Sequence, residues 1–322
     1  MPSTERSAQR SHKDFLSVLD FEPADLERCL SLAAQVKADR PLGREAPWTD
    51  ALGGRHVAML FEKASLRTRS TFEIAVHEIG GHVLALQTDA ALGDREAVAD
   101  VARNLERWVD AVVIRTFSQQ TLETFAAATT RLHVINALTD DQHPCQALAD
   151  SLTLCERWGS TRGRTIAFIG DGNNVAASLA HAAAMLGINM HVASPEGYQL
   201  PHSIVQQATQ VARHGARLRL FTDPADAVVG ASAVYTDTWT SMGHEAEARR
   251  RRDAFAPYQV NEGLMSLAKP DALFMHCLPA HRGEEVTVDV LESPASVVFD
   301  QAENRLHCQK ALLLMLLAHS PV

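Results

Sequence analysis

The sequence has no long apolar run, no paired cysteine motif and no excess of basic residues. None of its segments reaches the roughly 18 consecutive apolar residues of a membrane-spanning helix, so we expect no transmembrane segment. Its five cysteines include no CxxC pair, which argues against a disulfide framework and a structural zinc site and predicts a reducing, cytoplasmic location. The net charge of −9 argues against nucleic acid or an anionic membrane as a partner, because both bind extended basic surfaces.

What the chain does contain is an alternation of short β-branched runs with helical patterns over 322 residues. Such alternation is typical of α/β folds, in which helices cover both faces of parallel sheets. The length suits two domains of about 150 residues each. We therefore predict an α/β protein of two doubly wound, mainly parallel-sheet domains.

The predicted strands divide between the two halves of the chain. They are 56–61, 82–87, 111–116 and 133–138 in the first half, and 165–171, 189–195, 217–222, 232–237, 272–278 and 296–301 in the second. A helix over 143–159 joins the halves, and an apolar helix is predicted over 303–319. We expect residues 1–146, with the C-terminal helix packed back on them, to form one domain and residues 150–300 to form the other.

Cations and hydroxyls gather in FEKASLRTRS, residues 61–70, between a predicted strand and a predicted helix. The unpaired backbone N–H groups at a helix start favour an anion there. Ser65 and Thr68 add hydroxyl donors, and Arg67 adds a planar fork suited to phosphate oxygens. The alternative is a serine N-cap followed by a solvated basic turn, and the fragment alone does not decide between the two interpretations.

Other polar residues occur at the predicted ends of elements. Arg115 ends a strand, His143 and Gln146 open the linking helix in HPCQ, and Arg305 opens the last helix. Parallel-sheet proteins bind ligands at such ends. Each of these residues alone is also explained by a salt bridge or a helix cap.

Five motifs occur in one order along the chain: SLRTR, HPCQ, DTWTSMG (237–243), HCLPAHRGEE (276–285) and AENR (302–305). In order and spacing they resemble the ornithine carbamoyltransferases, and the similarity covers almost the whole chain. The resemblance implies transfer of the carbamoyl group of carbamoyl phosphate to the δ-amine of ornithine, giving citrulline and phosphate without metal or organic cofactor. It also implies an active site in the cleft between the domains, and a homotrimer or a multiple of trimers.

The same resemblance implies roles for individual residues. Carbamoyl phosphate would be bound by Ser65, the backbone of Leu66, Arg67, Thr68, Arg115, His143, Gln146 and Arg305. Ornithine would be bound by Asn174, Asp237, Ser241, Met242, Cys277 and Leu278. Of these, Arg115, His143 and Cys277 would lie nearest the reacting atoms.

Fixed donors suit this reaction, because negative charge develops on the carbonyl oxygen and on the leaving phosphate. Direct attack by the neutral amine suffices, so Cys277 is not expected to be a covalent nucleophile. Without the SMG motif, Cys277 would be explained as a small buried residue at a strand end. The resemblance further implies that the Leu278–Pro279 peptide bond is cis, and that the charged stretch 243–255 belongs to a loop that closes over ornithine. By charge density alone, that stretch is predicted to be a solvated face.

Three alternatives remain open on the sequence. GDGNNVA (170–176) follows a predicted strand as a dinucleotide-binding loop does, but Val175 stands where the third glycine belongs, which disfavours a nicotinamide-dependent oxidoreductase. A carbamoyltransferase could use N-acetylornithine, putrescine or aspartate instead, although Asp237 favours a free α-amino acid because a buried carboxylate needs the ammonium it pairs with. The third is a weakly active paralogue with a binding or regulatory role, since Leu66 and Ala91 replace polar residues usual in the family.

Overall fold

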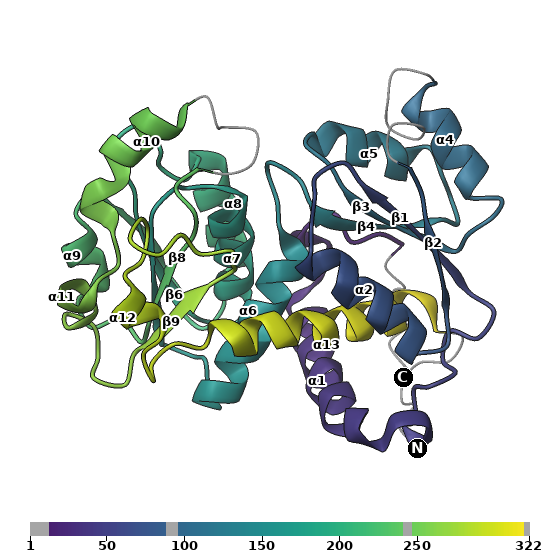
Figure 1. Ribbon diagram of the computed structural model, residues 1–322, viewed down its shortest axis with the longest axis horizontal. Coiled ribbons are helices and arrows are strands. Elements are labelled where there is room, and N and C mark those ends of the chain that lie inside the picture. The colour runs from purple at the N-terminus through teal and green to yellow at the C-terminus, as the bar shows by residue number, and fades with distance from the viewer. Residues whose placement is uncertain (1–12, 88–95, 241–246, 319–322) are drawn as a thin grey trace, which may run out of the picture.

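Two α/β domains lie side by side in the computed structural model, which describes residues 13–87, 96–240 and 247–318 (Figure 1). The first domain holds a four-stranded sheet of order β2-β1-β3-β4, and the second a five-stranded sheet of order β7-β6-β5-β8-β9. Every neighbouring pair of these strands is parallel. The predicted fold class is confirmed.

The strands of the first sheet are β1 (His56–Phe61), β2 (His82–Ala85), β3 (Ala111–Arg115) and β4 (His133–Leu138). Those of the second are β5 (Thr165–Ile169), β6 (Asn189–Ala193), β7 (Leu218–Phe221), β8 (Ala233–Thr236) and β9 (Leu273–His276).

The helices up to the second sheet are α1 (Pro23–Asp39), α2 (Arg67–Glu78), α4 (Val98–Leu105), α5 (Gln119–Ala127) and α6 (Pro144–Trp158). Those that follow are α7 (Asn174–Met185), α8 (His202–Val211), α9 (Pro224–Val228), α10 (Ala248–Phe255), α11 (Glu262–Met265), α12 (Val288–Leu291) and α13 (Val298–Leu317). Short 3₁₀ turns are η1 (Val18–Asp20), η2 (Arg40–Glu45) and η4 (Ala256–Tyr258).

The strands are apolar because both faces of each sheet are covered by helices. In β3, Val112 and Ile114 pack against α4 and α5, whereas Val113 belongs to the large core that includes residues of α1, α2, α6 and α13. In the second sheet, Phe168 faces the α7 side and Ala167 faces the side of α9 and α12. Successive side chains point to opposite faces, so a strand buried on both faces shows a continuous apolar run.

The predicted strand over 296–301 is wrong. Ser296 forms an isolated β-bridge with Phe274, but α13 begins at Val298, before the start at residue 303 that the sequence predicted. Val297 and Val298 are buried, and they belong to different apolar cores. The β-branched pair that favoured a strand instead packs at the beginning of a helix, where tertiary burial outweighs local propensity.

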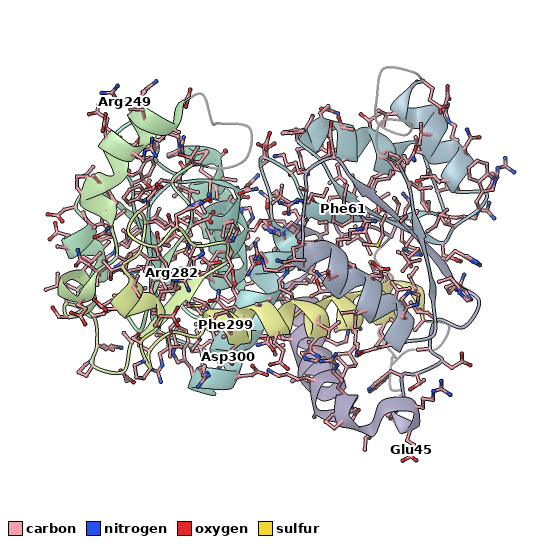
Figure 2. The ribbon with its side chains drawn as sticks, in the orientation of Figure 1. Glu45, Phe61, Arg249, Arg282, Phe299 and Asp300 are labelled. Atoms are coloured by element: carbon pink, nitrogen blue, oxygen red, sulfur yellow. The ribbon has the colours of Figure 1, made fainter. Side chains whose placement is uncertain are left out.

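The helices α6 and α13 connect the two domains. α6 joins the two sheets, and the boundaries predicted at residues 146 and 150 both fall within it and stay a prediction. α13 packs against α6, α1 and α2, and Figure 2 marks Phe299 and Asp300 in its first turn near the junction. Asp300 pairs with Arg157 of α6 there. Among the described residues, no helix is long and apolar enough to cross a membrane.

Candidate active site

The polar residues predicted at element ends converge at one edge of the first sheet. Arg115 is the last residue of β3, His143 immediately precedes α6, and Arg67 opens α2 after β1. The carboxyl ends of parallel strands share one edge of a sheet, so these residues are brought together by topology. Arg305 does not open the last helix as predicted but lies within α13, which begins at Val298, and its Nη2 donates to Thr68 Oγ1 at 2.7 Å.

The turn that starts α2 is both a capped helix start and a cluster of donors. Ser65 Oγ accepts a hydrogen bond from the Thr68 N–H at 3.3 Å, so the serine cap considered from the sequence is present. Leu66 contributes no side-chain cap and is 76% exposed. The backbone N–H groups of the first turn and the helix dipole favour an anion at this end of α2, where Arg305 contacts Thr68.

Lys63 does not join that cluster, although it belongs to the same charged stretch. Its side chain is buried, its ammonium pairs with Asp140, and it lies 4.1 Å from the centre of the Phe117 ring. Lys63 thereby ties the β1–α2 turn to the loop that leads from β4 to α6. Its role is to hold two segments of the site together.

Arg67, Thr68, Arg115, His143, Gln146 and Arg305 form what we call the cationic cluster. Burial, followed by the charges of Arg305 and Arg67, lowers the pKa of Arg115 to about 10. Burial, followed by the charges of Arg305, Arg115 and Arg67, lowers the pKa of His143 well below its ordinary value. His143 is therefore neutral at pH 7, and the cluster keeps one neutral imidazole among its guanidinium groups.

Three buried nitrogen atoms of the cationic cluster have no hydrogen-bond partner among residues 13–87, 96–240 and 247–318. They are Arg115 Nε, Arg305 Nε and His143 Nδ1. Within the same residues, no ion pair joins Arg67, Arg115 or Arg305 to a carboxylate. Buried donors and cations without partners are costly. Such an arrangement is suited to a small multivalent anion.

A second group of residues, the Asp237 cluster, is formed by Asp237, Asn173 and Cys277. Asp237 follows β8 and is buried; its Oδ2 accepts from Asn173 Nδ2 at 2.8 Å, and its Oδ1 accepts from Cys277 Sγ at 2.9 Å. Burial, followed by the Asp237 charge, raises the pKa of the Cys277 thiol well above its ordinary value. The thiol stays protonated at pH 7 and donates to the carboxylate, so it is not a reactive thiolate.

The remaining predicted residues lie around these two groups. Asn174 opens α7, and its Nδ2 donates to the Thr139 carbonyl at 2.5 Å, across the junction between the domains. The Leu278 N–H donates to His276 Nδ1 at 2.8 Å, and the Leu278–Pro279 bond is cis as predicted. Ser241, Met242 and Ala91 lie outside the described residues.

The ligand atoms of Asp237, His276 and Cys277 lie within 4.8 Å of one another, which is close enough to hold a metal ion. Each of them, however, already has a protein partner. The Cys277 thiol donates to Asp237, and the two ring nitrogens of His276 contact the Leu278 N–H and, at 3.2 Å, Glu285 Oε1. These contacts hold the loop after β9 against β8, and a metal ion would have to displace them.

Of the charged stretch 243–255, the structure describes residues 247–255, and these are only partly the solvated face that the charge density predicts. Arg249, Arg250 and Arg252 of α10 are exposed, and Figure 2 shows Arg249 at the outer edge of the second domain. For Arg251 the prediction is wrong. It is buried, pairs with Asp171 after β5, and donates to the Trp239 carbonyl, so it anchors α10 beside the Asp237 cluster.

Sequence reasoning missed Asn173, Asp150 and Gln301. Asn173 caps α7 by accepting from the Val175 and Ala176 N–H groups, and it contacts Asp237 with the other end of its amide. Asp150 contacts Gln146, and Gln301 contacts Asp150. Asp150 follows Gln146 by one helical turn, and Gln301 precedes Arg305 by one turn, so helical spacing was the available signal.

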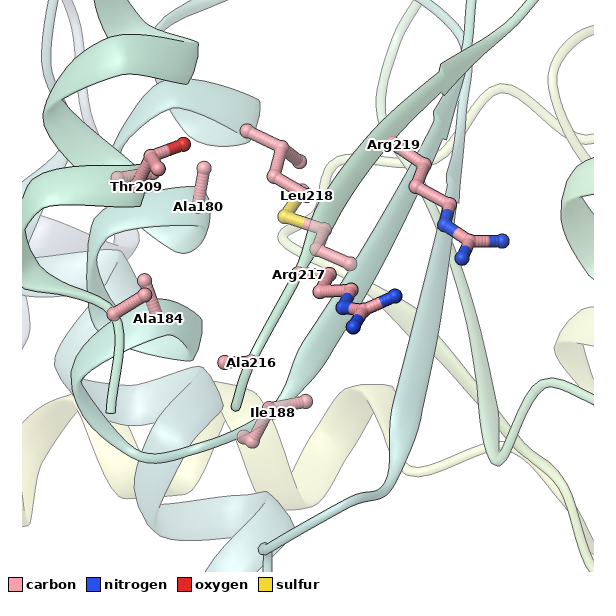
Figure 3. A pocket seen from close by; sticks show the side chains of 11 residues that line it. Ala180, Ala184, Ile188, Thr209, Ala216, Arg217, Leu218 and Arg219 are labelled. Carbon is pink, nitrogen blue, oxygen red and sulfur yellow. The ribbon is translucent and has the colours of Figure 1, made fainter. Parts of the chain in front are cut away.

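A hollow of about 260 Å³ lies elsewhere, between α7, α8 and β7, and differs from this site in character (Figure 3). It is lined mostly by apolar side chains, among them Ala180, Ala184 and Ala208. Arg219, also at its edge, extends away from it in Figure 3. This hollow lacks the convergent polar groups that the edge of the first sheet provides.

Comparison with protein families assigns both halves of the chain. Residues 13–156 match the description "Aspartate/ornithine carbamoyltransferase, carbamoyl-P binding domain". Residues 162–316 match "Aspartate/ornithine carbamoyltransferase, Asp/Orn binding domain".

Individual relatives match along nearly their whole length. An ornithine carbamoyltransferase from Anoxybacillus flavithermus is 49% identical, over 96% of this chain and 98% of that protein. A relative from Pyrococcus furiosus named "Ornithine carbamoyltransferase, anabolic" is 46% identical, over 95% of this chain and 96% of that protein. The solved structure of an ornithine carbamoyltransferase from the same organism has a TM-score of 0.91 and 45% identity, over 97% of this chain and 99% of that one.

Proposed function

Because the chain belongs to the aspartate/ornithine carbamoyltransferase family, we propose that it is an ornithine carbamoyltransferase serving amino-acid biosynthesis in arginine metabolism. It transfers the carbamoyl group of carbamoyl phosphate to the δ-amine of L-ornithine and forms L-citrulline and phosphate. The observation that carries this proposal is the cationic cluster, in which buried guanidinium groups lack carboxylate partners among the described residues.

We propose that the cationic cluster binds carbamoyl phosphate. The first turn of α2, with Ser65, the backbone of Leu66, Arg67 and Thr68, takes the phosphate, because N–H groups and a guanidinium fork match its oxygens. The remaining residues, Arg115, His143, Gln146 and Arg305, hold the carbamoyl end, and Arg115, His143 and Arg305 donate to its carbonyl oxygen. Negative charge grows on that oxygen and on the leaving phosphate, so donors fixed before the reaction stabilise the transition state more than the ground state.

The second domain binds ornithine in this proposal. Asp237 pairs with the α-ammonium group, and Asn174, Ser241, Met242 and Leu278 complete the amino-acid site. The neutral δ-amine attacks the carbonyl carbon, the bond to the phosphate oxygen breaks, and phosphate leaves with the proton that the attacking nitrogen gives up. Cys277 lies beside the attacking amine and holds Asp237 through its protonated thiol. Its raised pKa supports direct transfer without a covalent enzyme intermediate.

Ornithine is favoured over the other acceptors because it carries both an α-ammonium and an α-carboxylate group. N-acetylornithine has no α-ammonium charge, and a buried carboxylate such as Asp237 is penalised when it lacks an ammonium partner. Putrescine keeps an ammonium group but has no α-carboxylate, so it loses the contacts that the rest of the amino-acid site makes with that group.

We further propose that the protein works in the cytoplasm as a homotrimer or a multiple of trimers. Its five cysteines are all free thiols, which supports a reducing compartment. Light scattering coupled to size-exclusion chromatography tests the assembly. A mass of one or two chains would contradict it.

A colorimetric citrulline assay tests the proposed function. Purified protein with carbamoyl phosphate and ornithine should form citrulline and phosphate in equal amounts, and chelator-treated protein should do the same. Failure to form a carbamoylated product with any amine acceptor would overturn the proposal and favour a binding or regulatory role. Oxidation of NADH by candidate ketoacids, followed at 340 nm, should not occur.

A further inference from the structure

Asp150 is a buried carboxylate that lies beneath both clusters. It lies on α6 and is fully buried. Its Oδ1 accepts from Gln146 Nε2 at 2.8 Å and from Gln301 Nε2 at 2.9 Å. Its Oδ2 accepts from the Tyr235 hydroxyl at 3.1 Å. An ionised carboxylate only accepts hydrogen bonds, so it dictates that three donors, from α6, α13 and β8, all face it.

Asp150 affects the cationic cluster by orienting the amide of Gln146. With its NH₂ group held by Asp150, the Gln146 amide must present its oxygen on the other side. Gln146 Oε1 accepts from Arg305 Nη1 at 2.5 Å, and Arg305 Nη2 donates to Thr68. If the Gln146 amide turned over, its NH₂ group would face the guanidinium, and two donors would oppose each other. The orientation of Arg305 therefore depends on Asp150 through Gln146.

Asp150 also affects the Asp237 cluster, by orienting the amide of Gln301. With its NH₂ group held by Asp150, Gln301 presents its oxygen to the His276 N–H, which donates to Gln301 Oε1 at 3.0 Å. His276 immediately precedes Cys277, the thiol that donates to Asp237. Tyr235, the third partner of Asp150, lies on β8 two residues before Asp237. The same carboxylate thus fixes backbone and side chains that support Asp237.

We propose that Asp150 is a positioning residue that aligns the two substrate sites, by fixing the amide of Gln146 below one site and the amide of Gln301 below the other. The inference rests on the proposed function, because its readout is the kinetics of two substrates. Asp150 acts through these neighbours, and no contact with a substrate is assigned to it.

The charge of Asp150 supports this role. Burial raises its pKa to about 6 despite hydrogen bonds from Gln301, Gln146 and Tyr235, so the carboxylate is mainly ionised at neutral pH. The groups that face it electrostatically are Arg305 on α13, Tyr235 on β8 and Cys277 after β9. The buried negative charge of Asp150 lies beside the buried Arg305 and offsets part of the positive charge of that guanidinium group.

Steady-state kinetics of three variants tests the proposal, with citrulline formation by the wild type established first. Asp150→Ala should raise KM for both substrates by about tenfold or more, because both amides lose the acceptor that orients them. Asp150→Asn keeps one oxygen acceptor and the shape, so it should recover much of that loss. Gln301→Met removes only the contacts that lead from Asp150 to the Asp237 cluster. It should therefore raise KM for ornithine several-fold more than KM for carbamoyl phosphate.

Thr153→Val is the matched control. It removes a buried hydrogen bond between the same two helices, from Asn304 Nδ2 to Thr153 Oγ1 at 2.9 Å, farther along α6 from the two clusters. It should lower the melting temperature while leaving both KM values within about threefold of wild type.

Folded Asp150→Ala with both KM values near those of the wild type would overturn the proposal. If Asp150→Ala does not fold, Gln301→Met decides, and an equal rise in both KM values would contradict it. A wild-type protein that forms no citrulline would instead refute the proposed function, so the two failures are distinguishable.

Discussion

The cationic cluster gathers donors from several separate elements, whereas the Asp237 cluster is organised around one carboxylate. Arg67, Arg115 and Arg305 come from α2, β3 and α13, and they have no carboxylate partners among the described residues. Asp237, in contrast, already accepts from Asn173, Cys277 and the Thr238 N–H. One cluster is suited to a dianion that pairs directly with its guanidinium groups. The other is a satisfied anion that needs only an ammonium.

Removing a cation from the first cluster should have the largest effect. Arg115→Ala or Arg67→Ala should lower kcat/KM by about 10²- to 10³-fold or more, because the transition state loses a fixed donor. Arg103→Ala, in an exposed arginine of α4 paired with Asp100, controls for the lost charge and should retain activity. Near-normal turnover by either cluster variant would refute the assignment of the first site.

Neutralising the carboxylate of the second cluster should separate the two sites. Asp237→Asn should raise KM for ornithine by about 10- to 150-fold, the equivalent of about 1.5–3 kcal/mol for a hydrogen bond to a charged group. KM for carbamoyl phosphate should change little. Asp226→Asn, on the exposed side of α9, is the control. Equal effects on both substrates would contradict the division of roles.

The pKa of His143 predicts how the stability of the cationic cluster depends on pH. Its folded pKa lies below its unfolded value, so the unfolded chain binds the extra proton first as pH falls. The contribution of neutral His143 to the free energy of unfolding is complete above about pH 6.5. It is lost below that pH, by up to about 1.4 kcal/mol per pH unit. Urea unfolding at pH 7 and pH 5 should show a smaller loss of free energy of unfolding in His143→Asn than in the wild type. Equal losses would mean that the pKa of His143 is the same in the folded and the unfolded protein.

Restoring a hydroxyl beside the phosphate site should have the smallest effect. Leu66→Thr should lower KM for carbamoyl phosphate by about two- to tenfold, as one added hydrogen bond worth about 0.5–1.5 kcal/mol would do. Leu66 is exposed, so Leu66→Ala should leave KM unchanged and serves as the control. An unchanged KM in Leu66→Thr would show that the site has adapted to the leucine.

Polar side chains differ in how far the sequence predicted their positions. Arg115 and His143 were predictable as neighbours because the carboxyl ends of parallel strands and the starts of the following helices share one edge of a sheet. Arg305 was expected at a helix start, but it lies within α13, and helix packing brings it to Thr68. The burial of Lys63 and Arg251 was not predictable, because each is buried by a partner far away in the sequence, Asp140 and Asp171. A charged residue next to other charged residues gives no sign of which one turns inward.

Contacts between residues far apart in the sequence also limited the prediction of the last helix and of Asp150. The strands from residue 56 to residue 276 were located by their apolar runs, since burial on both faces gives parallel strands a clear signal. The run at residues 296–301 gave the same signal but begins α13, because it packs into two cores at once. The sequence did not predict a role for Asp150, for a related reason. Its partners Tyr235 and Gln301 lie far along the chain, and only the fold brings them together.

The comparison of acceptors tests the central claim most directly. Ornithine, N-acetylornithine, putrescine and aspartate should be offered in parallel with saturating carbamoyl phosphate, and kcat/KM measured for each by formation of the carbamoylated product. If the cationic cluster binds carbamoyl phosphate and the second domain binds both the α-ammonium and the α-carboxylate of ornithine, ornithine should exceed every other acceptor by at least about tenfold. A higher kcat/KM with putrescine or N-acetylornithine would contradict the account.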